Sequence, residues 1–338
     1  MSTNKLENIP KTYYLNLDSR EDRREHTENQ FKTFGIKNYE RISASKFLAS
    51  EFDDWKHLVF NADQKIYSDN ILHRVELGTA VSYIDFLENW LKTTSDPYLL
   101  LMEDDHDLSY IEYWHFDWNY LMSKLPYDWD CIQLGFENFW EIPCFLHPIH
   151  PYHSLGPSLI KRRYAEKLVE IHLVDGQYNF HQQNRNFKWS VKKDWSCSFI
   201  HPYSKRKIEM SGSGRPTPST ADYFLGHCGK TYCLPLISLM PDFGSYETDY
   251  HRNDRGDLLF TRRAYDLWWK KLKDSVSLEQ FFSYGKPNDF YIDRDNIDVL
   301  SKWKDFIYNP NGILKSLNDW SIQRLLFMMT IKLIDTHQ

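Results

Sequence analysis

Short apolar runs and amphipathic stretches alternate along the first part of the chain. The runs TYYLNLD at 12–18 and YERISA at 39–44 have the length and composition of strands. A helix is predicted between them, because Ser19 and Asp22 have capping-box spacing and Gly35 stands where a C-terminal cap belongs. Strand, helix and strand within about 30 residues form a βαβ unit, which predicts a parallel sheet.

The middle of the chain continues the same alternation. Residues 76–91 carry apolar side chains at helical spacing, and YLLLM at 98–102 is a continuous apolar run of strand length. Such a run suits a strand that is buried on both faces of a parallel sheet. Further strands are predicted at 130–135 and 231–239, and residues 158–172 should begin as a strand and become a helix.

The carboxyl-terminal part has a different pattern. Residues 203–220 are polar, basic and rich in turn residues, which predicts a surface loop. From about residue 263 the chain is predicted to be helical, and its last apolar stretch is expected to dock on the body of the protein. This divides the chain into an α/β domain at 1–262 and a helical extension at 263–338 packed on it.

Composition excludes several classes of protein. The 338 residues are 41% hydrophobic and 26% charged, which is ordinary for a globular protein. The net charge of −6 disfavours general nucleic-acid binding, since proteins that bind the phosphate backbone are usually basic. No apolar run is long enough for a membrane span, and the first residues lack an apolar signal core. We therefore expect a cytoplasmic protein whose five cysteines are free thiols, with peripheral membrane attachment through the C-terminal helices as an option.

The strongest chemical signal is the segment LLLMEDDHDL, in which a predicted buried strand runs into four acidic residues. The carboxyl end of a parallel strand is where open α/β sheets bind ligands. In an extended chain Glu103 and Asp105 point the same way and Asp104 points away. Carboxylate oxygens on so short a span suit Mg²⁺ or Mn²⁺, which in turn bridge phosphates. The alternative is a solvated acidic loop after a strand.

Two other segments carry candidate chemistry. Arg20, Arg23 and Arg24 follow the first strand at the predicted start of a helix, where guanidinium groups suit a diphosphate. A solvated helix face is the alternative. The segment GSYETDYHRND, which contains Glu247 and His251, follows a predicted strand, and an active-site loop and a hydrated loop explain it equally well.

Several segments resemble, in order, the blocks of glycosyltransferase family 25, which includes bacterial lipopolysaccharide and lipooligosaccharide sugar transferases and the collagen galactosyltransferases. YYLNLDSREDRRE is similar to the opening block of that family, and LLLMEDDHDL is similar to its acidic block. The remaining similar segments are RISA, RVELGTAVSY, SLIKRRYAEKL and TADYFLGH, so that the resemblance spans roughly residues 12–250.

The resemblance implies a GT-A fold, which is a Rossmann-like α/β domain with a mixed sheet. It also implies a nucleotide-sugar donor, usually linked to UDP, and a divalent cation, Mn²⁺ or Mg²⁺, held by the acidic motif. The reaction is then an inverting, metal-dependent transfer of a hexose to a hydroxyl. The acceptor is a glycan, a lipid-linked glycan or a protein hydroxyl, and the sequence leaves this choice open.

Site residues follow by motif. Glu103 and Asp105 would hold the metal, with His251 as a further ligand. Asp222 is the candidate base, because an inverting transfer needs a proton acceptor beside the acceptor hydroxyl, and Glu247 is its rival. The nucleotide side would be lined or supported by nine residues: Asn16, Asp18, Arg20, Arg23, Ala44, Glu76, Gly78, Ser82 and Asp104.

The sequence departs from the family at Tyr83, where the family usually has histidine, and in the helical tail, which has no counterpart there. With the high aromatic content of 16%, the first departure motivates an alternative, a non-catalytic carbohydrate- or nucleotide-binding protein with the same fold. A nucleotidyltransferase that uses the same acidic site is a third class, and it would release pyrophosphate instead of a nucleoside diphosphate.

Overall fold

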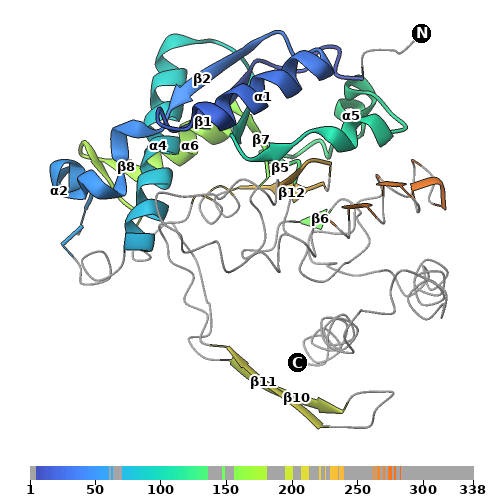
Figure 1. Ribbon diagram of the computed structural model, residues 1–338. Coiled ribbons are helices and arrows are strands. Elements are labelled where there is room, and N and C mark those ends of the chain that lie inside the picture. Colours follow the sequence, from blue (N-terminus) through green and yellow to red (C-terminus); the bar gives the residue numbers. More distant parts are fainter. Residues whose placement is uncertain are drawn as a thin grey trace.

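The structure is a computed structural model in which α-helices and strands are interspersed through the described part of residues 5–180 (Figure 1). It describes residues 5–60, 62–63, 71–135, 147–148, 156–180, 195–200, 207–212, 221, 225, 229–234, 236–239, 262, 265–266, 269–270, 273–275, 278 and 282. The α-helices are α1 (Glu21–Phe34), α2 (Phe52–Trp55), α4 (Ile71–Thr93), α5 (Trp118–Lys124) and α6 (Arg162–His172). The short 3₁₀ helices are η1 (Ser45–Phe47), η2 (Ala49–Glu51), η3 (Lys56–Leu58), η4 (Ser109–Tyr113) and η7 (Lys273–Ser275).

Within the described residues, the main sheet has seven strands in the order β2-β1-β3-β7-β5-β12-β6. Strands β2, β1, β3, β5 and β12 run in one direction, while β7 and β6 run in the other. This confirms the predicted βαβ unit and the mixed α/β sheet, an arrangement that fits a Rossmann-like fold. The strands are β1 (Thr12–Asn16), β2 (Tyr39–Ser43), β3 (Tyr98–Glu103), β5 (Cys131–Gln133), β6 (His147–Pro148), β7 (Ser158–Lys161) and β12 (Thr231–Cys233).

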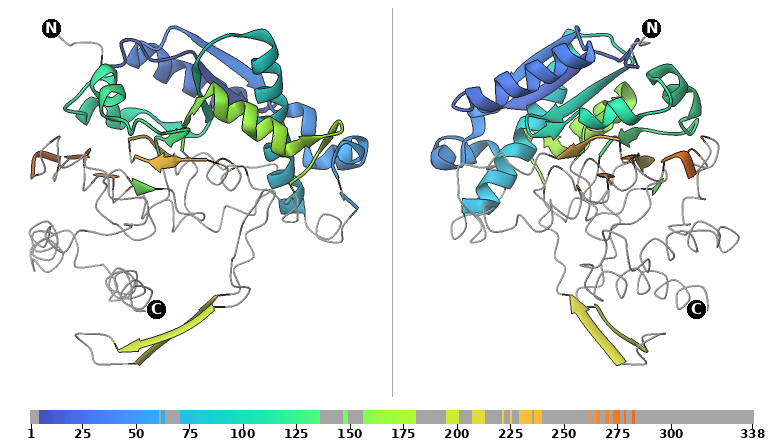
Figure 2. Two further views of the ribbon diagram at one scale, coloured as in Figure 1. Left: turned by 180° about the vertical axis from the view of Figure 1, so that it is seen from behind. Right: turned by 45° about the vertical axis from the view of Figure 1, so that its right-hand side comes forward.

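Side chains of the central strands enter two hydrophobic cores, one on each face of the sheet. In β3, Leu99 and Leu101 pack with α4 and α6, while Leu100 and Met102 pack with α1, η4 and α5. All four are buried, as the continuous apolar run predicts for a strand covered on both sides. Figures 1 and 2 show the resulting layers, with α1 on one face and α4 and α6 on the other.

The start of α1 differs from the sequence prediction. Its N-cap is Arg20, without a side-chain capping bond, so Ser19 and Asp22 do not form a capping box. The reason is that both carboxylate oxygens of Asp22 accept hydrogen bonds from the Arg20 guanidinium, at 2.9 and 2.7 Å. The predicted C-cap is confirmed: Gly35 has φ 73° and its N–H donates to the carbonyls of Phe31 and Lys32.

Two further segments correct the sequence reading. The predicted single strand at 231–239 is two strands, β12 in the main sheet and β13 (Ser238–Leu239), which pairs with β4 (His106–Asp107). The predicted loop at 203–220 contains β11 (Lys207–Gly212), which pairs with β10 (Trp195–Ile200) as an antiparallel hairpin, drawn below the sheet in Figure 1. A smaller hairpin joins β8 (Leu173–Val174) to β9 (Gln177–Tyr178).

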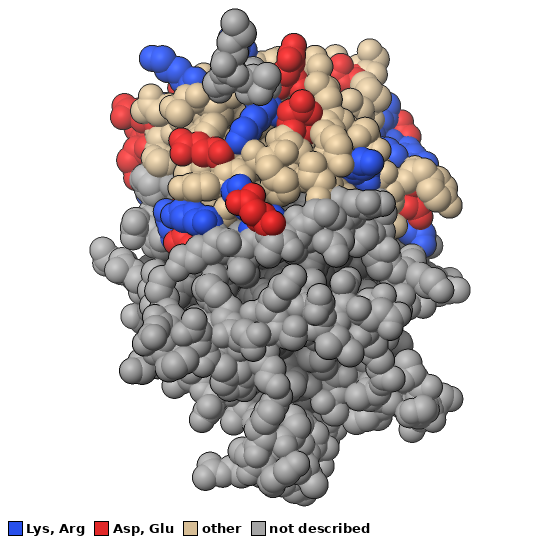
Figure 3. All heavy atoms as spheres, turned by 90° about the vertical axis from the view of Figure 1, so that its right-hand side faces the viewer, with Lys and Arg blue, Asp and Glu red and all other residues tan. Residues whose placement is uncertain are grey.

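The predicted helical extension lies mostly outside the described residues, and the boundary at 262 stays a prediction. The described part shows where this segment packs: Tyr265, Trp269 and Phe282 are buried in the core on the α1 side of the sheet. No helix in the described ranges is long and apolar enough to cross a membrane. Figure 3 shows acidic and basic side chains interspersed over the described part of one face. On that face, the acidic surplus is not gathered into one patch.

Candidate active site

The candidate site lies where three parallel strands end. Asn16 is the last residue of β1 and pairs with Ser43 at the end of β2, while Leu15 pairs with Glu103 at the end of β3. After Glu103 the chain turns through Asp104 and Asp105 and then forms the short strand β4. We call residues 103–107 the acidic turn. The strand ends therefore bring the opening motif and the acidic motif to one edge of the sheet, as expected for a ligand site.

Asp104 is held in a buried clamp. Its Oδ1 accepts a hydrogen bond from Arg23 Nη1 at 2.7 Å and its Oδ2 accepts one from Asn16 Nδ2, also at 2.7 Å. Thr27 Oγ1 donates to its backbone oxygen at 3.2 Å. Burial and the nearby Asp105 raise the pKa of Asp104, and Arg23 and Asn16 oppose that rise. Although the sequence groups Asp104, Asn16 and Arg23 with the nucleotide, the structure places them on one another.

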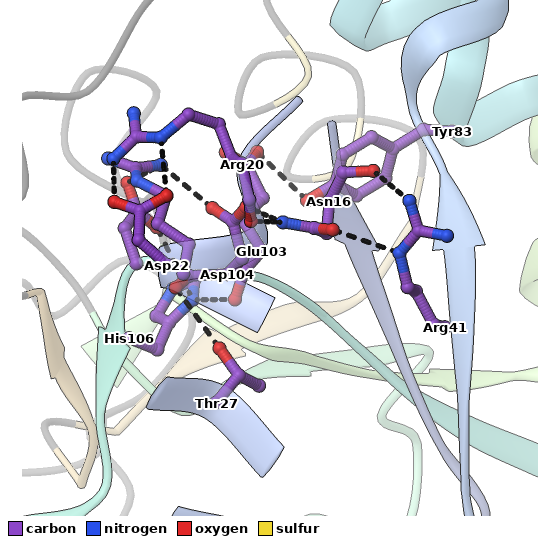
Figure 4. Close-up of polar contacts among 11 residues, drawn as sticks. Asn16, Arg20, Asp22, Thr27, Arg41, Tyr83, Glu103, Asp104 and His106 are labelled. Atoms are coloured by element: carbon purple, nitrogen blue, oxygen red, sulfur yellow. Dashed lines mark hydrogen bonds and ion pairs between the residues drawn. The ribbon is translucent and has the colours of Figure 1, made fainter. Parts of the chain in front are cut away.

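Asn16 also connects the clamp to β2. Its Oδ1 accepts a hydrogen bond from Arg41 Nε at 2.9 Å, so the amide lies between Arg41 and Asp104 (Figure 4). Arg41 forms an ion pair with Asp18, whose other oxygen accepts a hydrogen bond from Ser43 Oγ at 2.9 Å. These bonds lower the pKa of Asp18. Asp18 keeps more than half of its side chain exposed beside the ends of β1 and β2, where a ligand has access to it.

The Glu103 side chain points toward the face of the sheet that α4 covers, whereas Asp104 contacts α1 on the other face. Its Oε1 accepts a hydrogen bond from Tyr83 Oη on α4 at 3.1 Å. Burial and the carboxylates of Asp105 and Asp104 raise the pKa of Glu103 to about 8, against the smaller effects of Tyr83 and Arg23. Tyr83, the residue that departs from the family, is thus a direct neighbour of the acidic turn and is buried.

Asp105 carries the carboxylate oxygen that, among the described residues, is buried without a hydrogen-bond partner. Asp105 Oδ1 is buried and has no hydrogen-bond partner, although His106 Nδ1 lies 3.7 Å away. Its Oδ2 lies 4.0 Å from Arg23 Nη1. β3 ends at Glu103, so the alternation expected for an extended chain separates Glu103 from Asp104 but does not govern Asp105. A buried, unpartnered carboxylate oxygen is costly unless something binds it.

The acidic turn can offer a cation two carboxylates. Among the described residues, no three His, Cys, Asp or Glu side chains are grouped as a metal site. Mg²⁺ is commonly held by one or two carboxylates together with substrate phosphates and water. Asp105, whose buried Oδ1 has no hydrogen-bond partner, and its neighbour Glu103 would be the residues to hold such an ion.

Three further predicted residues lie around this edge with different surroundings. Arg20 binds Asp22 through two parallel hydrogen bonds and is partly buried. Ala44 donates its N–H to the Asn16 carbonyl at 3.0 Å and packs on the core beneath α4. Glu76 lies on α4, where its Oε2 is 3.1 Å from His73 Nδ1.

Gly78 and Ser82 hold the scaffold together. A Cβ atom at Gly78 would lie 2.3 Å from the carbonyl oxygen of Phe47, so this glycine allows η1 to approach α4. Ser82 Oγ donates to the Gly78 carbonyl at 2.8 Å and is buried. Both residues lie on α4 close to Tyr83. The space beside Gly78 is filled by Phe47, and the Ser82 hydroxyl is bound to the helix backbone.

We expect Gly78→Ala to destabilise the protein. Alanine usually improves a helix by up to about 1 kcal/mol over glycine. Here the new methyl group meets a backbone carbonyl that must move, and overpacking of this kind costs about 1–3 kcal/mol. Urea unfolding of Gly78→Ala and of the neighbouring control Thr79→Ala measures the difference. A Gly78→Ala protein as stable as the wild type would contradict the close approach.

The predicted base residues Asp222 and Glu247, and the predicted metal ligand His251, lie outside the described residues. The structure describes β13, which precedes Glu247 and His251 in the sequence. β13 pairs with β4, with Leu239 opposite His106, so β13 itself lies beside the acidic turn. The roles of these three residues stay predictions.

Sequence reasoning missed three groups that build the site. Arg41 stands in the RISA segment but was not singled out, and Thr27 and Gln30 have no motif of their own. Gln30 Nε2 donates to the His106 carbonyl at 2.9 Å, and Gln30 Oε1 accepts from Leu108 N–H at 2.7 Å. The spacing of Arg23, Thr27 and Gln30 on one face of α1 is the signal that could have found the last two.

The comparisons with known proteins bear on this same region. Residues 9–113 match the family model described as Glycosyltransferase family 25 (LPS biosynthesis protein). A search of curated proteins finds no match. The matched residues contain β1, α1, β2, α4, β3 and the whole acidic turn, whereas the similar segments SLIKRRYAEKL and TADYFLGH lie beyond them. Residues 9–113, the part of the chain that forms the acidic site, are therefore similar to glycosyltransferase family 25.

Proposed function

We propose that the protein is a metal-dependent, inverting glycosyltransferase with a GT-A fold. It would transfer a hexose from a UDP-sugar to a hydroxyl of a glycan, a lipid-linked glycan or a protein. The family match supports a glycosyltransferase. The observation that supports the metal is the unpartnered, buried Asp105 oxygen at the end of a parallel strand, beside the carboxylate of Glu103.

In this proposal, each described residue of the site has a distinct role. Glu103 and Asp105 would hold Mn²⁺ or Mg²⁺, which neutralises charge on a departing diphosphate when it is bound. Arg23 and Asn16 fix Asp104 and so hold the first half of the acidic turn in place. Tyr83 orients Glu103 by its hydrogen bond. The exposed Asp18 and its partly buried partner Arg41 form the edge against which the nucleotide would rest.

The proposed reaction is one displacement. The acceptor oxygen forms a bond to the anomeric carbon while the bond from that carbon to the diphosphate oxygen breaks, and the configuration inverts. The electron pair of the broken bond leaves with UDP. The proton of the acceptor hydroxyl passes to a carboxylate, for which Asp222 is the first candidate and Glu247 the second.

A donor panel tests the proposal. UDP-, GDP-, ADP- and CMP-sugars are incubated with the full-length protein and Mn²⁺, with a chelator control, and release of free nucleotide is measured. We expect release of UDP from a UDP-hexose that stops with chelator and returns with Mn²⁺. Binding without turnover would favour the non-catalytic alternative, and release of pyrophosphate would favour a nucleotidyltransferase. Sugar transfer that persists in the presence of chelator would contradict metal dependence but would still support a glycosyltransferase.

A further inference from the structure

Asp107, the last acid of the acidic turn, is bound by a residue far along the chain. Asp107 is buried, and its Oδ2 lies 3.2 Å from Arg262 Nη1. Its Oδ1 accepts a hydrogen bond from the Ser109 N–H at 2.8 Å. Both oxygens therefore have protein partners, in contrast to Asp105. Asp107 is thus better placed to anchor the turn than to bind a ligand.

The segment that supplies Arg262 is packed firmly beside the turn. Tyr110 Oη donates to Asp266 Oδ1 at 2.9 Å, and the Tyr110 and Tyr265 rings lie 5.4 Å apart. Tyr265 and Trp269 are fully buried in the same core as Met102 of β3. Arg262 therefore extends from a segment whose place is fixed by burial as well as by polar contacts.

The ion pair between Arg262 and Asp107 holds a short stretch of chain. The acidic turn is continuous with β3 at Glu103, and at its other end it enters β4, which has only two residues. β4 is held by its pairing with β13 and by the hydrogen bonds of Gln30. Asp105 lies two residues before Asp107. Movement of the Asp107 carboxylate would therefore shift the backbone that sets the direction of the Asp105 side chain.

We propose that Arg262 is a positioning residue for the acidic turn: its ion pair with Asp107 fixes the direction of the Asp105 carboxylate. Arg262 and the buried Tyr265 and Trp269, which lie outside the family match, would thereby contribute to the site. This inference rests on the proposed function only for its effect on metal use; its structural claim stands on the contacts themselves.

The test compares Arg262→Gln, Arg262→Lys and the control Lys270→Gln. Lys270 pairs with Asp266 in the same segment at 2.7 Å, so its loss removes a cation without touching Asp107. Hydrogen exchange of the peptide containing residues 103–108 is measured first. We expect Arg262→Gln to speed its exchange at least about tenfold, with Arg262→Lys and Lys270→Gln close to wild type. Exchange in the β1 peptide should stay unchanged.

The second readout is the Mn²⁺ concentration that gives half-maximal sugar transfer. Residues that orient metal ligands indirectly typically change metal affinity about 10–100-fold, and we expect an increase of about tenfold in Arg262→Gln that Arg262→Lys largely reverses. If the wild type transfers no sugar, the proposed function fails, and the exchange data still decide the role of Arg262. Should Arg262→Gln not fold, Asp107→Asn, which keeps the shape of the side chain, takes its place. Unchanged exchange at 103–108 would overturn the inference.

Discussion

Replacing Asp105 with asparagine is expected to reduce sugar transfer about 100-fold or more while leaving the protein folded. The carboxylate would be a ligand of the cation that stabilises the leaving diphosphate, and such charge stabilisation is worth several kcal/mol. Each 1.36 kcal/mol corresponds to about tenfold in rate. Steady-state transfer from the UDP-hexose, with Mn²⁺ at saturation for the wild type, measures the loss.

The free energy of unfolding of Asp105→Asn should be equal to that of the wild type or higher. Asp105 Oδ1 has no hydrogen-bond partner to lose, and the Asp105 charge is the largest repulsion that Glu103 experiences. Removal of that charge should lower the pKa of Glu103 toward its ordinary value and relieve the repulsion. A site residue whose loss costs activity but not stability is what a functional acid predicts. If Asp105 had only a structural role, its replacement would lower stability and change transfer little.

The matched control is Asp53→Asn, which makes the same chemical change at an exposed carboxylate paired with Lys56. It should change neither transfer nor stability, since surface pairs contribute little. Transfer by Asp105→Asn at near the wild-type rate would remove Asp105 from the metal site. Loss of transfer in both variants would point to a defect unrelated to the acidic turn.

Much of the fold around the site can be predicted from the local pattern of apolar and polar residues. The alternation of β1, α1, β2 and β3 is visible because each element satisfies its own period or apolar run. The position of the acidic motif at the end of β3 follows from that alternation. The sequence could therefore predict which edge of the sheet carries the site.

Which acid binds which partner could not be predicted in this way. Asp104 pairs with Arg23 across 81 residues of sequence, and Asp107 pairs with Arg262 across a still longer separation. Such pairs depend on the tertiary arrangement of α1, β3 and the late segment, which no local period encodes. As a result, residues that resemble nucleotide-binding positions of the family prove to hold the acidic turn.

Competition between local interactions explains the smaller errors. Asp22 has the spacing of a capping box, but the Arg20 guanidinium binds both of its oxygens. The run at 231–239 resembles one strand, but after β12 the chain passes so close to Gly135, two residues beyond the end of β5, that a Cβ atom there would lie 2.3 Å from the Ile237 carbonyl oxygen. The chain thus leaves the main sheet after β12 and pairs with β4 through β13, a change of partner that the apolar pattern alone does not reveal.

The largest effect on stability is expected from Arg23→Met. Arg23 and Asp104 are both nearly inaccessible to solvent, and their ion pair is 2.7 Å long. Removal of one partner from a buried pair leaves an uncompensated charge and costs about 3–5 kcal/mol. Against a total stability of about 5–15 kcal/mol, this is a large fraction. Urea unfolding with a matched control, Arg24→Met, measures it.

Arg24 is the next residue on the same helix, and its pair with Glu21 is exposed, so Arg24→Met should cost at most about 1 kcal/mol. A double variant, Arg23→Met with Asp104→Asn, removes the charge that the single variant leaves unpaired, while the new amide oxygen can still accept from Asn16. The double variant should therefore be more stable than Arg23→Met alone, a coupling that independent sites do not show. If instead Arg23→Met unfolds like Arg24→Met and only weakens binding of UDP, Arg23 acts on the nucleotide, as the family resemblance implies, and the buried clamp does not stabilise the fold.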